Sequence, residues 1–249
     1  MKAADQRTAR EFGIPLDQLM EQAGNSVAKF CLRQYPDARH IVLLCGKGNN
    51  GGDGLVAARA LAAAGQMVRV LLLGRANEIQ GEAAVALQRL QDEAPSALLD
   101  EIVDEAGLKA CTDFLRNAEL LIDALVGTGF KPPLRGLAVS LREMVEETET
   151  TVVAVDLPSG WDADSMEQSA GDAFRADAVV TFTAPKLAHV FGHLTRSERT
   201  GGTFGPIVVA GIGSPEEAVQ SAAHLHWTGT AKALIERPRS VNANKGTFG

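Results

Sequence analysis

The sequence is short of cysteine, and this bounds the kind of protein it can encode. The 249 residues include three cysteines, Cys31, Cys45 and Cys111, which are odd in number and widely spaced. This pattern disfavours a disulfide framework or a zinc knuckle, so a reducing, cytoplasmic compartment is expected. A chain of this length buries roughly 70–75% of its unfolded surface, and a hydrophobic core is therefore sufficient without disulfides.

Long apolar runs and an excess of positive charge are also missing. No run approaches the 18 apolar residues of a membrane helix, and the first residues lack the apolar core of a signal peptide. Lys and Arg number 24 against 31 Asp and Glu, which gives a net charge of −7. This balance argues against nucleic acid or a membrane surface as a partner. A local anion site built from backbone dipoles stays open.

The most informative segment that is present is rich in glycine. Five of the nine residues in Gly46–Gly54 are glycine, after an apolar run at His40–Cys45 and before a helical pattern at Leu55–Ala64. A strand, a glycine loop and a helix in this order form a cradle for an anion, because the helix N-terminus and free N–H groups point at it. The glycines are expected to allow positive φ and a close approach of ligand to backbone.

Apolar strands alternate with amphipathic helices along the chain. Six strands are expected, at Ile41–Leu44, Met67–Leu73, Leu120–Val126, Thr151–Val155, Ala178–Thr183 and Pro206–Ala210. The other helices are expected at residues 16–35, 82–93, 108–117 and 138–147. This alternation predicts an α/β fold with a doubly wound, mostly parallel sheet and helices on both faces. The alternation of strands and helices becomes irregular after residue 213. We therefore expect one domain over residues 1–213 and a distinct segment over 214–249.

Polar residues gather where the predicted strands end. Gly46–Gly54, Asp123–Pro133, Asp156–Gly160 and Lys186 all lie at or just after the carboxyl ends of strands. In an open α/β sheet these ends form the crevice where ligands bind. The convergence of these segments predicts a binding site there.

The glycine segment contains the spacing of a dinucleotide fingerprint, Gly46-x-Gly48-x-x-Gly51. The second strand, however, ends in Leu73-Gly74-Arg75 without the acid that would hold a ribose. Arg75 could instead bind a 2′-phosphate, so an NADP-dependent oxidoreductase is one alternative. A tight turn that binds no ligand is another. No Gly-Lys-Ser/Thr follows at the spacing of a Walker loop, which excludes that motif.

Several oxygen-bearing side chains suggest a cation site. Asn50, Asp123 and Ser159 supply hard oxygen ligands, which suit Mg²⁺, Ca²⁺ or an alkali cation and not zinc. Asp123 could equally be a buried carboxylate that accepts hydrogen bonds from backbone N–H groups. His189 and His193 have the spacing of a helical metal pair, but Gly192 interrupts the segment, and a solvated loop is expected.

Together these motifs resemble those of the NAD(P)HX epimerase family, the YjeF N-terminal domain. The segments that carry the resemblance are Gly48–Gly54, Asp123–Gly129, Asp156–Gly160 and Thr181–Lys186, with Leu19–Gly24 matching the family's first helix. Gln22 stands where the family usually has asparagine. The resemblance covers roughly residues 1 to 213.

This resemblance implies a Rossmann-like fold and an isomerase that interconverts the R and S forms of hydrated NADH and NADPH. It places the potassium ligands on Asn50, Asp123 and Ser159, which favours the metal interpretation of Asp123. It places substrate contacts on Asn49, Asn50, Gly51, Gly52, Asp53, Gly127, Thr128, Gly129, Phe130, Lys131, Pro132, Pro133 and Asp156.

Inversion at C6 of the hydrated ring needs a group that donates and accepts a proton, and we expect Asp156 in this role with Lys186 assisting. Residues 237–249 resemble the opening of an ADP-dependent dehydratase domain, with Asn244 where histidine is common. The chain is therefore expected to be the first part of a bifunctional repair enzyme, and a homodimer is expected from the family. The alternatives are an NADP-dependent oxidoreductase and a non-catalytic interaction module of the same fold.

Overall fold

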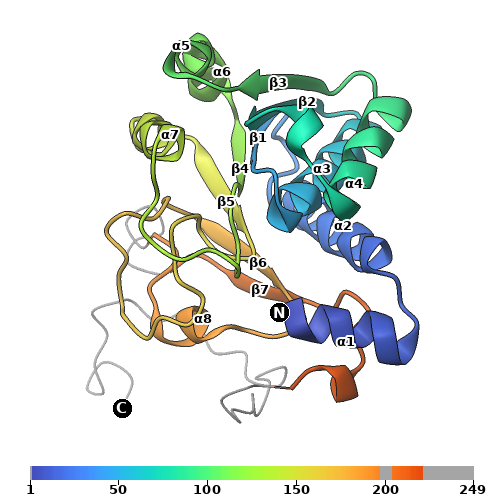
Figure 1. Ribbon diagram of the computed structural model, residues 1–249. Helices are drawn as coiled ribbons and strands as arrows, with labels where there is room; N and C mark the ends of the chain where they lie inside the picture. The colour runs from blue at the N-terminus through green and yellow to red at the C-terminus, as the bar shows by residue number, and fades with distance from the viewer. Residues whose placement is uncertain (1, 197–203, 221–249) are drawn as a thin grey trace.

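The computed structural model describes residues 2–196 and 204–220, and its centre is one parallel sheet (Figure 1). Seven strands pair in the order β3-β2-β1-β4-β5-β6-β7, and every pair is parallel. The strands are β1 (His40–Cys45), β2 (Met67–Leu73), β3 (Leu98–Ile102), β4 (Leu120–Ala124), β5 (Thr151–Val155), β6 (Ala178–Phe182) and β7 (Ile207–Ala210). The predicted doubly wound α/β fold is confirmed.

Helices cover both faces of this sheet, and the two largest hydrophobic cores among the described residues lie beneath them (Figure 1). One core lies under α2 (Leu16–Gln34), α3 (Asn49–Ala63) and α4 (Gly81–Glu93). The other lies under α5 (Glu105–Ala110), α6 (Thr112–Asn117) and α7 (Leu137–Glu146). The five residues of β4 and of β6 are all buried, as expected for strands covered on both sides.

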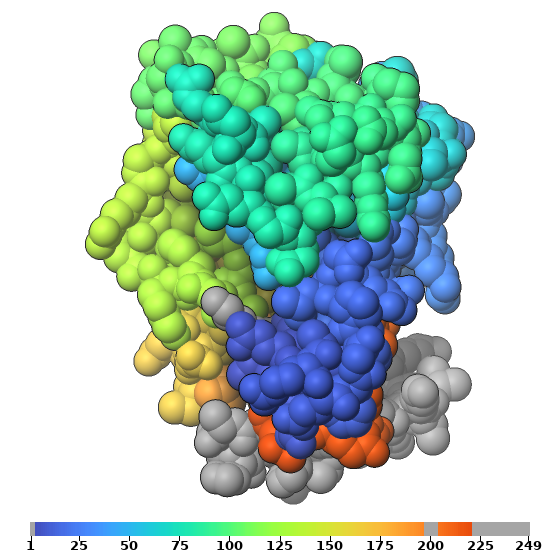
Figure 2. All heavy atoms as spheres, turned by 45° about the vertical axis from the view of Figure 1, so that its right-hand side comes forward, coloured from blue at the N-terminus to red at the C-terminus, as the bar shows by residue number. Residues whose placement is uncertain are grey.

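One strand and two α-helices of the described residues lie outside the predicted set. The edge strand β3 has partly exposed Asp100 and Glu101, so it lacks the apolar run that marks the central strands. Helix α1 (Lys2–Phe12) packs against α2 and against the short turn η3 (Glu216–Ala218), and Figure 2 shows α1 and η3 side by side on the surface. Helix α8 (Leu187–Phe191) occupies the segment expected to be a loop.

The chain reverses its direction of winding between β1 and β4. These strands are neighbours in the sheet, with Leu44 opposite Asp123 and Cys45 opposite Ala124. In such sheets the carboxyl ends at the reversal point open a crevice. The segments predicted to carry chemistry all reach this end of the sheet.

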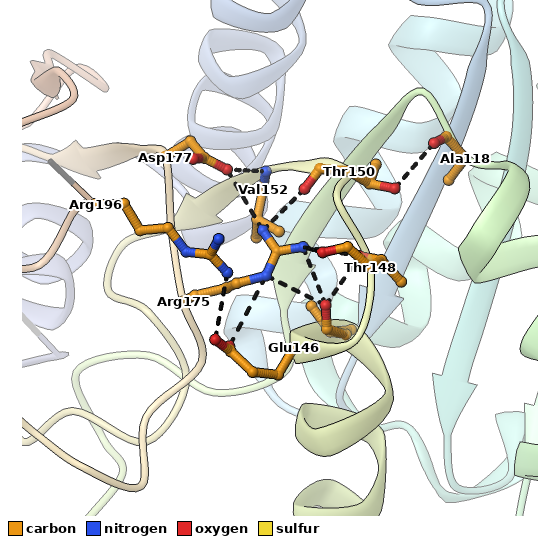
Figure 3. Close-up of polar contacts among 9 residues, drawn as sticks. Ala118, Glu146, Thr148, Thr150, Val152, Arg175, Asp177 and Arg196 are labelled. Atoms are coloured by element: carbon orange, nitrogen blue, oxygen red, sulfur yellow. Dashed lines mark hydrogen bonds and ion pairs between the residues drawn. The ribbon is translucent and has the colours of Figure 1, made fainter. Parts of the chain in front are cut away.

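A polar network fixes the opposite end of the sheet (Figure 3). The buried Arg175 donates to the carbonyl oxygens of Val145, Thr148 and Thr150 at 2.8–3.2 Å. Its guanidinium also lies 3.6 Å from the Asp177 carboxylate. These contacts join the end of α7 to the starts of β5 and β6. Within residues 2–196 and 204–220, no helix is long and apolar enough to cross a membrane.

Candidate active site

Most of the glycine-rich segment, Asn49–Gly54, is the start of helix α3, and only Gly46–Gly48 form the predicted loop. The helix begins at Asn49, with Gly48 as its N-cap, six residues before the predicted start. None of the glycines in this segment has a positive φ, so that expectation was wrong. A Cβ on Gly51 would lie 1.8 Å from the Gly46 carbonyl oxygen, and one on Gly52 would lie 2.6 Å from the Met20 sulfur. Close packing therefore requires glycine here despite its low helix propensity.

A cavity of about 660 Å³ opens at the N-terminus of α3. This volume is in the range of small-molecule sites. The backbone N–H groups of the first turn of α3 have no partner within the helix and suit an anion. The predicted site residues that line the cavity are Asn49, Asn50, Asp53, Gly127, Thr128, Gly129, Phe130 and Asp156.

Other predicted contacts lie away from this cavity. Gly51 and Gly52 are buried in the packing of α3. Lys131 is exposed and pairs with Asp162 at 2.7 Å and Asp164 at 2.9 Å. Pro132 and Pro133 are also exposed. The loop after β4 thus lines the cavity up to Phe130, turns outward at residues 131–133 and lines the cavity again at Leu134.

Asp156 lies just after β5 in an unusual backbone conformation. Its φ of 66° is in the left-handed region, which a non-glycine residue rarely adopts outside functional sites and turns. Its Oδ2 accepts hydrogen bonds from the amide and hydroxyl of Thr128 at 3.0 and 2.9 Å. Its Oδ1 accepts from the Thr181 hydroxyl at 2.8 Å and from Lys186 Nζ at 2.6 Å. The carboxylate thus accepts four hydrogen bonds.

The electrostatic environment keeps Asp156 ionised. Burial would raise its pKa, but the Lys186 ammonium and the hydrogen bonds from Lys186, Thr181 and Thr128 together hold the pKa well below its usual range. Lys186 Nζ also donates to Thr181 Oγ1 at 2.6 Å and to the Phe182 carbonyl at 3.2 Å. All three of its N–H groups are therefore engaged.

His189 is a member of this site that the sequence did not reveal. It lies in α8, partly buried, where Nδ1 accepts from the Lys186 amide at 2.9 Å and Nε2 bonds to the Asp156 carbonyl oxygen at 2.7 Å. Burial, and then the charge of Lys186, lowers its pKa to about 4. The predicted solvated loop is wrong for His189, because α8 holds its ring against Asp156, but it is confirmed for His193, which is exposed beyond the end of α8. His193 instead stacks against Phe204.

Asp123 and Ser159 meet beneath the cavity. Both side chains are buried, and Asp123 accepts from the Ser159 amide at 2.7 Å, the Ser159 hydroxyl at 2.6 Å and the Leu125 amide at 3.3 Å. Burial raises the pKa of Asp123 to about 6, against the effect of these hydrogen bonds. Ser159 Oγ also lies 3.2 Å from the Val126 carbonyl oxygen. Backbone and hydroxyl groups thus donate hydrogen bonds to the Asp123 carboxylate. This agrees with the prediction of a buried carboxylate that accepts hydrogen bonds from backbone N–H groups.

Asn50 approaches the same region from α3. Its Nδ2 is buried without a hydrogen-bond partner in the described part of the chain. A Cβ on Gly127 would lie 2.8 Å from Asn50 Oδ1 and 3.0 Å from Asp156 Oδ2. Gly127 therefore separates the two side chains, and only glycine leaves both in place. Among the described residues, no group of three His, Cys, Asp or Glu side chains could hold a metal.

Two further carboxyl groups line the cavity, Asp53 on α3 and Asp5 on α1. Burial raises the pKa of Asp53 well above its usual range, and the nearby charges of Asp156 and Asp5 raise it further. Burial also raises the pKa of Asp5. No sequence motif marks Asp5, because it reaches the cavity only through the packing of α1.

The sequence of this chain is similar to a known family model and to two named proteins. Residues 16–188 match the family model described as YjeF-related protein N-terminus. An NAD(P)H-hydrate epimerase from Rhodopirellula baltica is 35% identical over 222 residues, which are 88% of this chain and 84% of that protein. One from Limosilactobacillus fermentum is 38% identical over 192 residues, covering 76% of this chain and 86% of that protein.

Longer proteins and one solved structure are also similar. The bifunctional NAD(P)H-hydrate repair enzyme Nnr of Moorella thermoacetica is 35% identical over 255 residues, covering 100% of this chain and 46% of that enzyme. The chain thus spans less than half the length of this relative. The crystal structure of yeast ynu0, YNL200c, superposes with a TM-score of 0.66 at 28% identity and covers 78% of this chain and 82% of that one.

Proposed function

Because the chain belongs to the family of YjeF-related protein N-termini, we propose that it is an isomerase that interconverts the R and S forms of hydrated NADH and NADPH. Two relatives of similar length carry the name NAD(P)H-hydrate epimerase. The observation that carries the proposal is the ionised Asp156, bonded to Lys186, in a nucleotide-sized cavity at the N-terminus of α3.

The phosphates of the nucleotide bind at the start of α3. The free N–H groups of its first turn and the helix dipole favour negative charge there. Asn49 and Gly127–Gly129 also line the cavity and contact the substrate. The hydrated nicotinamide ring then lies beside Asp156.

The reaction inverts one carbon. C6 of the hydrate carries a hydroxyl and is bonded to the ring nitrogen, so its configuration is lost when a bond at C6 breaks and regained when that bond forms again. Loss of the hydroxyl through an iminium and opening of the ring to an aldehyde both achieve this. Asp156 acts as the proton-transfer group near C6, and Lys186 fixes its charge and position.

A potassium ion binds to Asn50, Asp123 and Ser159. The donors are an amide oxygen, a carboxylate and a hydroxyl, which suit a hard cation. The single carboxylate among them matches a single positive charge. An ion held by these residues would supply a positive charge that favours the ionised form of Asp123.

The test of the activity uses a mixture of the R and S hydrates. An S-specific, ATP-dependent dehydratase consumes the S form, and the loss of the R form is followed with and without this protein. We expect faster loss of the R form with the protein. No acceleration would reject the epimerase and favour the non-catalytic binding module, whereas NADP-dependent oxidation of a substrate would favour the oxidoreductase. Arg75, which that alternative needs, does not line the main cavity.

The potassium proposal is tested by thermal unfolding. KCl is expected to raise the Tm of the wild-type protein above its value in tetramethylammonium chloride at equal ionic strength, because a ligand that binds only the native state stabilises it. Ser159→Ala is expected to abolish this difference. Equal Tm values in both salts for the wild type would reject the site.

The protein works together with an ADP- or ATP-dependent dehydratase of the same substrate. The match to part of a bifunctional repair enzyme supports fusion of residues 1–213 to such a domain, with residues 214–249 as the connection. Residues 221–249 lie outside the described structure. All three cysteines are buried free thiols, which supports a reducing cytoplasm. Homodimer formation also belongs to this proposal, and the mass of the protein in solution tests it.

A further inference from the structure

A second cavity adjoins the main one at the carboxyl ends of β2 and β3. Its volume is about 490 Å³. The charged residues that line it follow β1, β2 or β3, and they are Lys47, Arg75, Glu78 and Asp104. Lys47 and Leu73 line both cavities, so the two meet at the end of β2. The proposed chemistry at Asp156 leaves this second cavity without a role.

Lys47 lies where the two cavities meet. Gly74, directly after β2, has a φ of 134°, and a Cβ there would lie 2.7 Å from Lys47 Cδ. Glycine at this position therefore lets the Lys47 side chain lie against the end of β2. The Lys47 ammonium pairs with Glu78 Oε2 at 2.7 Å, and both side chains are exposed. An exposed ion pair contributes little to stability, so a ligand that extends from one cavity to the other displaces it at low cost.

Arg75 is the charged group of this cavity that is left for a ligand. Asp104 is the N-cap of α5, where its carboxylate accepts a hydrogen bond from the Gly107 amide at 2.7 Å. Glu78 is bonded to Lys47, and this hydrogen bond is the main cause that lowers its pKa, whereas the charge of Arg75 contributes least. Arg75 itself is exposed and forms no ion pair within the described part of the chain. Its guanidinium is therefore available to bind an anionic group.

The order of the strands indicates which part of a dinucleotide reaches this cavity. The sheet has the order β3-β2-β1-β4-β5-β6, with β7 added at the edge, and such a sheet binds a dinucleotide across the point where the winding reverses, with one nucleotide on each side. Here this point lies between β1 and β4. Asp156 follows β5 on one side of it, and Arg75 follows β2 on the other. With the hydrated ring at Asp156 and the phosphates at the start of α3, the adenosine half extends towards Arg75.

We infer that the second cavity binds the adenosine end of the hydrated nucleotide and that Arg75 is a specificity-determining residue that binds its 2′-phosphate. This inference rests on the proposed function, and it makes the hydrate of NADPH the preferred substrate. A guanidinium matches the charge and the geometry of a phosphate. The free ribose hydroxyl of NADH is instead bound by an acid at the end of the second strand. Here Gly74 and Arg75 follow that strand, and the next acid, Glu78, is held by Lys47.

The experiment compares the wild type with Arg75→Gln on the hydrates of NADPH and NADH, and Arg33→Gln is the matched control. Arg33 is also exposed, but it lies in the last turn of α2, shortly before β1 begins, at the opposite end of the sheet. The wild type is expected to have the lower KM for the NADPH hydrate. R75Q is expected to raise this KM about tenfold or more, the effect of losing one charged hydrogen bond, and to leave the KM for the NADH hydrate within about twofold. Calorimetry with NADP⁺ and NAD⁺ should show the same difference, and R33Q should match the wild type in both measurements.

The outcomes separate this inference from the proposed function. An active wild type whose R75Q variant keeps its KM for both hydrates overturns the inference alone. An equal rise in KM for both hydrates also overturns it, because Arg75 would then bind a group that the two hydrates share. If the wild type has no epimerase activity, calorimetry decides. A loss of affinity in R75Q for NADP⁺ but not for NAD⁺ would support the 2′-phosphate site without the reaction, and unchanged affinities would overturn both.

Discussion

His189 donates a hydrogen bond from Nε2 to the carbonyl oxygen of Asp156, at 2.7 Å. The tautomer follows from the partners, because the Lys186 amide can only donate to Nδ1 and the carbonyl can only accept from Nε2. The neutral imidazole thus forms hydrogen bonds to the backbones of both Asp156 and Lys186. Asp156 has a left-handed conformation, and Lys186 is the N-cap of α8. Protonation of His189 would break the bond from Lys186.

Acid is therefore expected to destabilise the protein through His189. Its pKa is about 4 in the native state, below the value of about 6.5 in an unfolded chain. The stabilisation is complete above pH 6.5 and is lost as the pH falls towards 4, because the unfolded state then binds the extra proton. Over this range the wild type is expected to lose on the order of 2–3 kcal/mol from this group. Urea unfolding between pH 7 and 4.5 measures the loss.

His189→Gln is expected to be less stable than the wild type at pH 7 but to have a shallower dependence on pH. His193→Gln is the matched control, since His193 lies outside this network and contacts Phe204. Parallel pH profiles for the wild type and H189Q would show that His189 does not act in this way.

The ion pair between Asp156 and Lys186 is expected to separate activity from stability. Asp156→Asn should abolish epimerisation and leave nucleotide binding measurable, because it removes the charge and keeps the shape. Lys186→Met leaves an ionised carboxylate buried without its cation and is expected to cost about 3–5 kcal/mol. The double variant should recover much of this stability and none of the activity. Denaturant unfolding and the hydrate assay measure the two effects, and a wild-type rate in D156N would remove Asp156 from the mechanism.

Gly127 and Gly129 offer a matched pair of substitutions in one loop. A Cβ on Gly127 would lie 2.8 Å from Asn50 Oδ1 and 3.0 Å from Asp156 Oδ2, whereas one on Gly129 would meet nothing within 4 Å. Gly127→Ala is therefore expected to lower stability by about 1–3 kcal/mol and to displace both side chains. Gly129→Ala should remain within about 0.5 kcal/mol of the wild type. Thermal unfolding distinguishes them, and similar Tm values would mean that Asn50 and Asp156 move apart freely.

Central strands could be predicted from the sequence because they are buried on both faces. The bounds of β2 and β5 match the prediction to the residue, since continuous apolar runs mark such strands. The edge strand β3 escaped prediction because it is half exposed and includes Asp100 and Glu101. The start of α3 escaped because glycine disfavours a helix locally, while close packing against β1 and α2 requires it.

The site could be predicted in part for a similar reason. Asp156 and Lys186 follow the ends of strands, where the sheet brings polar residues together, and the chain contains recognisable motifs around them. His189 and Asp5 reach the site through a five-residue helix and a separate N-terminal helix. Neither placement leaves a periodic signal, because both depend on tertiary packing.

The Arg175 network is expected to control stability without controlling the reaction. Arg175 satisfies three carbonyl oxygens at the end of the sheet away from the cavity, and it is 8% exposed. Arg175→Met removes these donors and leaves buried carbonyls and Asp177 without the guanidinium, so a loss of about 3–5 kcal/mol in the free energy of unfolding is expected.

Arg196→Met is the matched control, because Arg196 makes a single 3.5 Å ion pair with Glu146 in the same network. This substitution should cost less than about 1 kcal/mol. At a temperature where both variants are folded, their kcat in the hydrate assay should equal that of the wild type. A folded R175M with a lower kcat would show that the two ends of the sheet are coupled.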